Sequence, residues 1–140
     1  MSSKETVDTI LRGYHAFVAC DLATVWELLD PEIEWFGVAS GLPPADLEEV
    51  RRILMDRLAD GYRIELERCI GKGDEVLVAF RAAGVEKDTH DDRPLQTRRY
   101  FTIGRFWAIV TVRDGRVVRV RDYPDLQAGL DALGVEEDAV

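Results

Sequence analysis

Hydrophobic and polar residues alternate most regularly in the C-terminal third of the chain, where the pattern predicts two antiparallel strands joined by a tight turn. Residues 100–112 consist mainly of Tyr, Phe, Thr, Ile, Val and Trp, the types that favour β-strands. The pair Asp114-Gly115 then forms a typical two-residue turn. One face of the second strand is predicted to carry Val118, Val120 and Asp122. A carboxylate on the apolar face of a strand is unexpected, so Asp122 is the first candidate for a functional residue.

Helical and strand-like patterns cover most of the remaining chain. Apolar residues recur every three to four positions, as in amphipathic helices, over residues 4–19, 22–29, about 44–60 and 126–133. Strands are predicted over residues 32–36, 62–70 and 75–85. The apolar face of the third helix includes Leu54 and Leu58, and one face of the 62–70 strand is predicted to carry Ile64, Leu66 and Ile70. Helices followed by a run of antiparallel strands are typical of an α+β domain with helices packed on one sheet face.

Composition and charge narrow the classes of partner. The 140 residues, 46% hydrophobic and 32% charged, most simply form one folded domain, residues 1–140. The net charge of −9 argues against binding to nucleic acid or to an anionic membrane, because both require a basic surface. The longest apolar run, Phe106–Val110, is far too short to span a membrane. The N-terminus does not resemble a signal peptide, so we expect a cytoplasmic protein.

The sequence contains no motif for a metal or a nucleotide cofactor. Cys20 and Cys69 lack metal-binding spacing and imply no disulfide framework. His90 lies in a polar segment with several aspartates, which is more typical of a solvated loop than of a metal site. The chain lacks the GxSxG motif, the P-loop and the Rossmann glycine pattern. We therefore expect neither a metal nor a cofactor.

Three groups of residues, in this order along the chain, indicate a known family. They are Asp21-Leu22 with Leu28-Leu29-Asp30-Pro31-Glu32-Ile33-Glu34-Trp35; Tyr62-Arg63-Ile64-Glu65 with Gly73-Asp74-Glu75-Val76-Leu77-Val78; and Arg113-Asp114-Gly115-Arg116-Val117-Val118-Arg119 with Arg121-Asp122-Tyr123-Pro124-Asp125 and Ala132-Leu133-Gly134. This set resembles the SnoaL-like polyketide cyclases and the ketosteroid isomerase-like proteins of the nuclear transport factor 2-like superfamily. The resemblance implies a strongly curved, mostly antiparallel sheet wrapped as a cone around three helices from the N-terminal half, with a short C-terminal helix. It also implies one apolar pocket at the open end and a homodimer, for which we expect the sheet face opposite the pocket to be the interface.

The resemblance also indicates two candidate catalytic residues. Asp122 matches an aspartate that is catalytic in the limonene epoxide hydrolase branch, and burial in an apolar pocket would raise its pKa towards the working pH. Its structural alternative is an ion pair with a neighbouring arginine or a backbone cap. Tyr14 falls where ketosteroid isomerases carry a tyrosine that stabilises an oxyanion. The structural alternative for Tyr14 is a core tyrosine whose hydroxyl is satisfied locally.

Other family residues are replaced in this chain. The general base of ketosteroid isomerases falls at Trp35 and their second oxyanion carboxyl at Trp107, so isomerisation by that mechanism is not expected. The further Asp and Arg of the epoxide hydrolases fall at Phe80 and Ala82, and that set is incomplete as well. The remaining pocket candidates are Trp35, Trp107, Arg105, Leu54 and Leu58. Two indoles would shape a flat slot beside a guanidinium, whereas the alternative is core packing for the tryptophans and an ion pair for Arg105.

From the resemblance and these candidate residues we expect a cofactor-free enzyme. It would perform acid/base chemistry on an apolar oxygenated metabolite, by cyclisation, isomerisation or dehydration. Asp122 would move the proton, and Tyr14 or Arg105 would stabilise the oxyanion. Two alternatives stay open: a non-catalytic small-molecule binder or dimeric interaction module, and an epoxide hydrolase, which would need a second carboxylate in the pocket.

Overall fold

Four helices and five strands make up the computed structural model, which describes residues 3–38, 41–85 and 100–136. The helices are α1 (Ser3–Val18), α2 (Leu22–Leu28), α3 (Leu47–Ala59) and α4 (Leu126–Leu133). The strands are β1 (Leu29–Phe36), β2 (Arg63–Lys72), β3 (Glu75–Val85), β4 (Tyr100–Arg113) and β5 (Arg116–Tyr123). The predicted elements are therefore present, with ends that shift by a few residues. The predicted loop around His90 lies outside the described residues.

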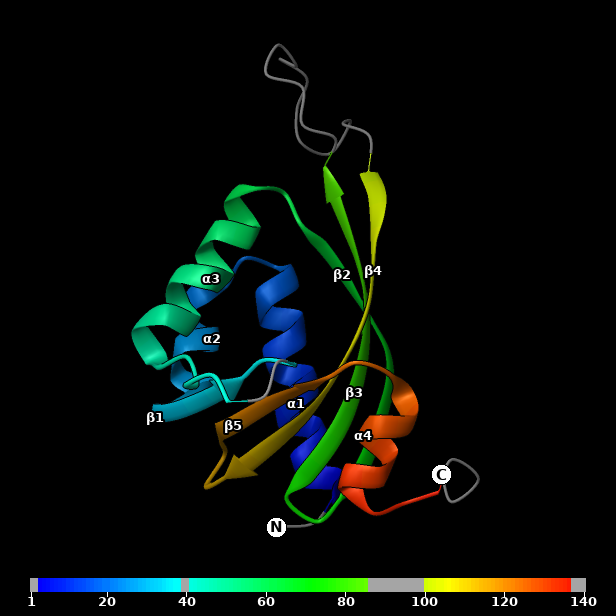
Figure 1. The fold of residues 1–140 in the computed structure, drawn as a ribbon. Helices are drawn as coiled ribbons and strands as arrows, with labels where there is room; N and C mark the ends of the chain where they lie inside the picture. The colour runs from blue at the N-terminus through cyan, green and yellow to red at the C-terminus, as the bar shows by residue number, and fades with distance from the viewer. Residues whose placement is uncertain (1–2, 39–40, 86–99, 137–140) are drawn as a thin grey trace.

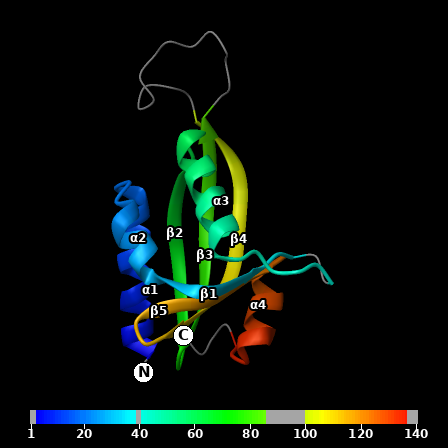
Figure 2. The same ribbon diagram turned by 90° about the vertical axis from the view of Figure 1, so that its left-hand side faces the viewer.

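All five strands form one sheet in the order β1-β5-β4-β3-β2. Neighbouring strands are antiparallel except β1 and β5, which run parallel. The sheet is strongly curved and not closed, so that β1 and β5 cross the lower ends of the other three strands (Figures 1 and 2). Helices α1, α2 and α3 lie on the concave face and α4 lies on the opposite face (Figure 1). This arrangement confirms the α+β prediction.

Three aspartates begin helices by accepting a hydrogen bond from a free backbone N–H group. Asp21 caps α2, Asp46 caps α3 and Asp125 caps α4. Asp46 explains why α3 begins at Leu47, later than the predicted start near Pro44. At the far end of α4, Gly134 adopts the left-handed conformation (φ = 80°) that glycine tolerates best. Within the described residues, no helix is both long and apolar enough to span a membrane.

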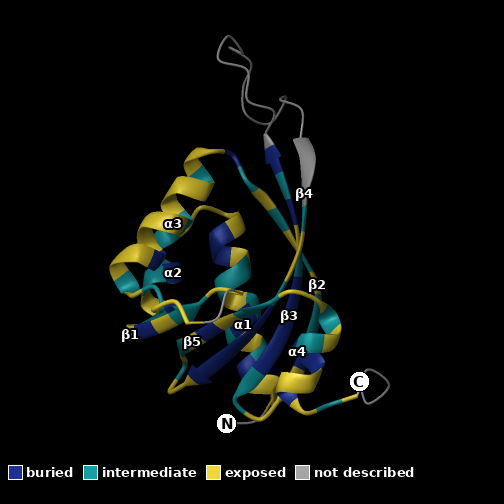
Figure 3. Ribbon diagram, in the orientation of Figure 1, coloured by how far each residue is buried: buried dark blue, intermediate teal, exposed yellow. Residues whose placement is uncertain are grey.

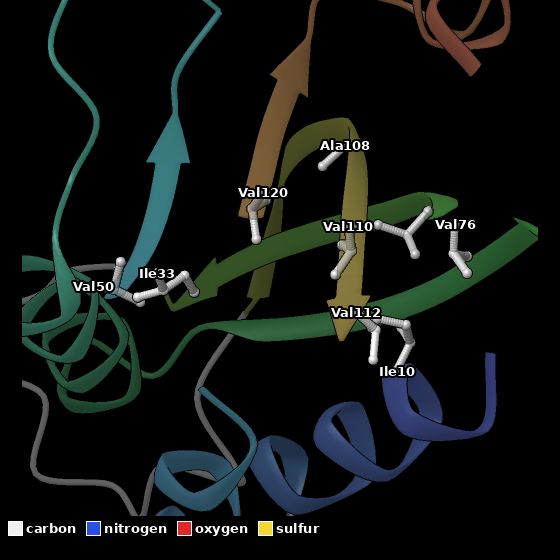
Figure 4. Close-up of a cluster of buried hydrophobic side chains, with 9 residues drawn as sticks. Ile10, Ile33, Val50, Val76, Ala108, Val110, Val112 and Val120 are labelled. Atoms are coloured by element: carbon white, nitrogen blue, oxygen red, sulfur yellow. The ribbon is translucent and has the colours of Figure 1, made fainter. Parts of the chain in front are cut away.

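The main hydrophobic core fills the space between the concave face and the helices. Its buried members are Ile10, Ile33, Val50, Val76, Val78, Ala108, Val110, Val112 and Val120, which come from α1, α3 and four of the strands (Figure 4). A second core lies on the opposite face, where α4 covers Ile70, Leu77 and Ile109. Its packing is tight, since a β-carbon added at Gly129 would lie 2.7 Å from Leu77 Cδ1.

Each antiparallel strand pair contains one register shift, which adds curvature and changes which side chains share a face. Between β2 and β3 the shift lies between Leu66 and Arg68. Two residues of β2 that are an even number of positions apart, one before the shift and one after it, therefore lie on opposite faces of the sheet. Leu66 packs against the concave core and Ile70 packs into the second core. The prediction that these two side chains share one face is wrong for this reason.

Candidate functional site

Asp122 lies on the concave face, near the end of β5. It is opposite Ala108 of β4 and two residues beyond Val120, both of which belong to the main core. The indole Nε1 of Trp35 donates a hydrogen bond of 3.1 Å to Asp122 Oδ1. Trp35 reaches it because β1 pairs in parallel with β5 and places Trp35 beside Val120. The sequence analysis named both residues separately, and the structure brings them into direct contact.

The surroundings of Asp122 act on the pKa of its carboxyl group in opposite directions, and the net effect is to raise it. Burial raises the pKa of Asp122, because the ionised carboxylate loses solvation, while the Trp35 hydrogen bond and the positive charge of Arg57 lower it by less. No ion pair is formed between Asp122 and an arginine of the described chain. The carboxylate is only half-buried and remains partly accessible. Asp122 therefore combines a raised pKa with partial exposure.

A register shift in the β4–β5 hairpin decides which residues lie beside Asp122. At the turn, Arg113 pairs with Arg116; the same register continued without a break would place Trp107 opposite Asp122. The shift between Thr111 and Val112 moves the pairing by one residue. Ala108 consequently lies opposite Asp122, and Trp107 lies opposite Tyr123.

The structure places Trp107 and Arg105 on the face opposite Asp122, and does not bring them into the site. Trp107 packs against the second core beneath α4. Arg105 is exposed, and its Nε donates a 3.0 Å hydrogen bond to Glu67 Oε1. These positions correct the expectation that both residues line the pocket, and they match the structural alternatives of core packing and an ion pair.

Tyr14 lies on the concave side, but its hydroxyl already has a partner. The hydroxyl donates a 3.1 Å hydrogen bond to the backbone carbonyl of Ile64 in β2. The ring lies 6.3 Å from the ring of Phe80, measured between centroids. Tyr14 thus links α1 to β2, and its proton is directed at the backbone rather than towards Asp122.

Phe106 is a concave-face residue that the sequence analysis missed. It pairs with Phe80 of β3, which packs against the main core, and it lies two residues before Ala108 on the same face of β4. Strand β5 ends at Tyr123, so Phe106 has no β5 residue beside it, and 49% of its surface is exposed. Strand alternation predicts that Phe106 and Ala108 share one face of β4. Only the shifted pairing with β5 shows that this is also the face of Asp122.

The inner face of α3 completes the surroundings of the site. Leu54 packs against both the main core and the cluster around Phe17, and Leu58 packs against that cluster. Both leucines are half-buried, whereas the outer face of α3 is exposed (Figure 3). Leu54 and Phe80 pack against the same main core as Trp35, the hydrogen-bond partner of Asp122.

Two other features lie away from this group. A surface depression of about 510 Å³ on the outer side of α3 is lined by Pro31, Asp46, Leu47, Glu48, Arg51, Arg52, Met55 and Asp56, and shares no residue with the pair Trp35–Asp122. Among the residues that the structure describes, no group of three or more His, Cys, Asp or Glu side chains could hold a metal ion.

Comparison with known proteins gives one family match. The family model described as a SnoaL-like domain matches residues 10–120. No curated protein matches the chain. Family membership therefore rests on the domain model, which covers most of the sequence.

Solved structures share the fold at low sequence identity. IdmH from Streptomyces antibioticus, a candidate polyketide cyclase, is 26% identical with a TM-score of 0.68, over 93% of this chain and 99% of its own. AclR from Streptomyces galilaeus, a candidate hydroxylase, is 16% identical with a TM-score of 0.67, over 95% and 98% of the two chains. A candidate SnoaL-like polyketide cyclase from Jannaschia sp. CCS1 is 20% identical with a TM-score of 0.64, over 96% and 94%. The names differ in the chemistry they state while the fold is the same.

Proposed function

This chain belongs to the SnoaL-like domain family, and we propose that it is a cofactor-free enzyme that performs acid/base chemistry on an apolar oxygenated metabolite. The reaction is a cyclisation, isomerisation or dehydration that begins at a carbon next to a carbonyl group. The single observation that carries this proposal is the half-buried Asp122, whose pKa is raised by burial beside an apolar wall.

Asp122 moves the proton in this scheme. Its carboxylate removes a proton from the carbon next to the carbonyl, and the electron pair of the broken C–H bond moves into the carbonyl group to give an enolate. The raised pKa makes Asp122 a stronger base than an exposed aspartate. The protonated Asp122 then returns the proton and becomes the starting carboxylate again. The proton goes to carbon in an isomerisation and to the leaving oxygen in a dehydration. In a cyclisation the enolate carbon attacks a second carbonyl carbon, and the proton goes to the alkoxide that this attack forms. Trp35 holds the carboxylate in place through its hydrogen bond.

The substrate class rests on the apolar residues near Asp122 and on one relative. Phe80, Phe106, Leu54 and Leu58 offer rings and alkyl groups to a ligand, which suits a flat and largely apolar molecule. IdmH is called a candidate polyketide cyclase and is 26% identical to this chain. A polyketide-like, ring-containing ketone is therefore the substrate that we propose.

Hydrogen–deuterium exchange tests this proposal without knowledge of the natural product. A panel of cyclic enones and the bicyclic ketone α-tetralone is incubated with the protein in D2O, and loss of the proton signal next to the carbonyl is followed by NMR. The wild type is expected to accelerate exchange of at least one ketone, and Asp122→Asn to abolish the acceleration. Asp114→Asn, in the turn of the same hairpin, is the matched control and keeps it. Equal exchange by the wild type and D122N contradicts the proposal.

A non-catalytic small-molecule binder is the second candidate. It is favoured by the absence of the family's catalytic carboxyl groups, whose positions are occupied by Trp35 and Trp107 in this chain. The same panel distinguishes it, because a binder changes the NMR spectrum of the protein without accelerating exchange. Epoxide hydrolysis would need a second carboxylate beside Asp122, where Phe80 and Ala82 contribute none.

We also propose that the protein forms a homodimer through the sheet face opposite the site. Next to α4, this face carries the ion pairs Arg81–Glu65 and Arg105–Glu67, so such an interface is partly charged. Light scattering at micromolar concentration tests it, and a monomeric mass contradicts it.

A further inference from the structure

Helix α3 carries three arginines, and their surroundings differ. The guanidinium of Arg51 lies over the ring of Trp26 in α2, 5.4 Å from its centroid. Arg52 lines the depression on the outer side of the helix. Arg57 does neither, and it forms no ion pair with any residue of the described ranges.

Arg57 lies at the edge of the helix face that is directed towards the sheet. It follows Leu54 by three positions, and residues three apart are neighbours on the helix surface. Leu54 and Leu58 both pack inward. Arg51 occupies the edge on the α2 side, which leaves Arg57 at the opposite edge.

The positive charge of Arg57 lowers the pKa of Asp122, although burial raises this pKa by more. No direct ion pair joins the two side chains. The guanidinium of Arg57 and the carboxyl group of Asp122 therefore belong to elements on the same concave side of the sheet, without an ion pair between them. An exposed guanidinium that forms no ion pair within the described residues is well suited to bind a carboxylate or enolate, because its planar N–H groups match the geometry of such oxygens.

We propose that Arg57 binds an anionic oxygen of the ligand, so that this site recognises a flat apolar molecule with a carboxylate or enolate group directed at α3. This inference rests on the proposed site around Asp122. It assigns to Arg57 the anion-binding role that the sequence analysis gave to Arg105, which lies on the opposite face. Phe106 contacts the apolar part of the ligand, and Arg57 fixes its orientation relative to Asp122.

Two probes of the same shape and different charge test this assignment. 2-Naphthalenesulfonate is an anion across the working pH range, whereas 2-naphthalenesulfonamide is neutral. Their affinities are measured by calorimetry, and the indole N–H signal of Trp35 reports whether binding occurs at the site. The wild type is expected to bind the sulfonate about tenfold more tightly than the sulfonamide, as one charge-assisted hydrogen bond would give.

Arg57→Gln is expected to abolish this preference and leave sulfonamide affinity unchanged. Arg57→Lys keeps part of the preference because the charge remains. Arg52→Gln is the matched control, since it removes the same charge from the outer face of the same helix, and it keeps the full preference. Circular dichroism establishes that each variant is folded. A wild type without preference for the sulfonate, or an R57Q protein that retains the preference, overturns the assignment of Arg57.

This outcome is independent of the deuterium-exchange result. A wild type that shows Asp122-dependent exchange but does not prefer the sulfonate refutes only the role of Arg57. A wild type that prefers the sulfonate, with the preference abolished in R57Q, but does not accelerate exchange supports Arg57 and refutes the catalytic role of Asp122.

Discussion

The indole of Trp35 donates a 3.1 Å hydrogen bond to the carboxylate of Asp122, and this contact joins two residues 87 positions apart in the sequence. The parallel pairing of β1 with β5 produces it, since Trp35 lies beside Val120 and Asp122 follows two residues later on the same face. The bond stabilises the charged carboxylate, whereas burial destabilises it more strongly. The proposed acid/base role depends on this balance.

Replacing Trp35, which donates the hydrogen bond, should raise the pKa of Asp122 further. In Trp35→Phe the hydrogen bond is lost, and with it a contribution that lowers the pKa of Asp122. We expect the pKa of Asp122 to rise further, measured by NMR titration of the carboxyl carbon. Trp26→Phe is the matched control on the same concave side and should leave the pKa unchanged. A lower pKa in W35F would show that the indole does not stabilise the carboxylate.

Asp122→Asn should change how the free energy of unfolding depends on pH. The folded pKa of Asp122 is raised, so the folded protein binds this proton more tightly than the unfolded chain. The cost of burying the charge is fully present above the folded pKa, and it is relieved as the pH falls through the folded pKa towards the unfolded one. The wild type should therefore gain stability relative to D122N as the pH falls through this window. Urea unfolding at several pH values measures this, and a constant difference would contradict it.

Phe106→Ala should weaken ligand binding more than it weakens the fold. About half of the Phe106 surface is already exposed at 49%, so truncation should cost less than about 1 kcal/mol. Leu77→Ala, at a side chain that is 1% exposed, should instead cost about 2–5 kcal/mol. We expect F106A to lower the affinity for 2-naphthalenesulfonamide. An F106A protein with wild-type affinity would remove Phe106 from the site.

Tyr14→Phe separates a structural role from a catalytic one. The hydroxyl of Tyr14 donates to the Ile64 carbonyl, and its removal should cost about 0.5–1.5 kcal/mol of stability. Because that proton is directed at the backbone, we expect Y14F to keep the deuterium-exchange rate of the wild type. An exchange rate lowered a hundredfold or more would instead show that Tyr14 stabilises the oxyanion.

Local pattern was sufficient to predict the elements of the fold. The helical spacing of apolar residues, the aspartate caps and the Asp114-Gly115 turn each depend on a few neighbouring residues, and each is present in the structure. The family resemblance added the curvature of the sheet. Asp122 could be named as a candidate because a carboxylate on an apolar strand face is unexpected, and Trp35 because the family resemblance places a catalytic position there.

The side of the sheet on which an individual side chain lies could not be predicted, because it depends on the register in which two strands pair. A single shift between Thr111 and Val112 separates Trp107 from Asp122 and brings Ala108 and Phe106 to the side of the site. Alternation along one strand does not reveal such a shift, which arises from the pairing of two strands. Arg57 could not be associated with Asp122 from the sequence for a related reason, since the carboxyl group whose pKa its charge lowers lies on a strand 65 positions later.

The pKa of Asp122, followed by NMR titration of its carboxyl carbon with and without α-tetralone, tests the central claim most directly. The account predicts a pKa clearly above the value of about 3.9 for an exposed aspartate, and a further change when the ketone binds. A pKa below that value which no ketone alters would show that Asp122 is a structural carboxylate, and would contradict its role as the acid/base group.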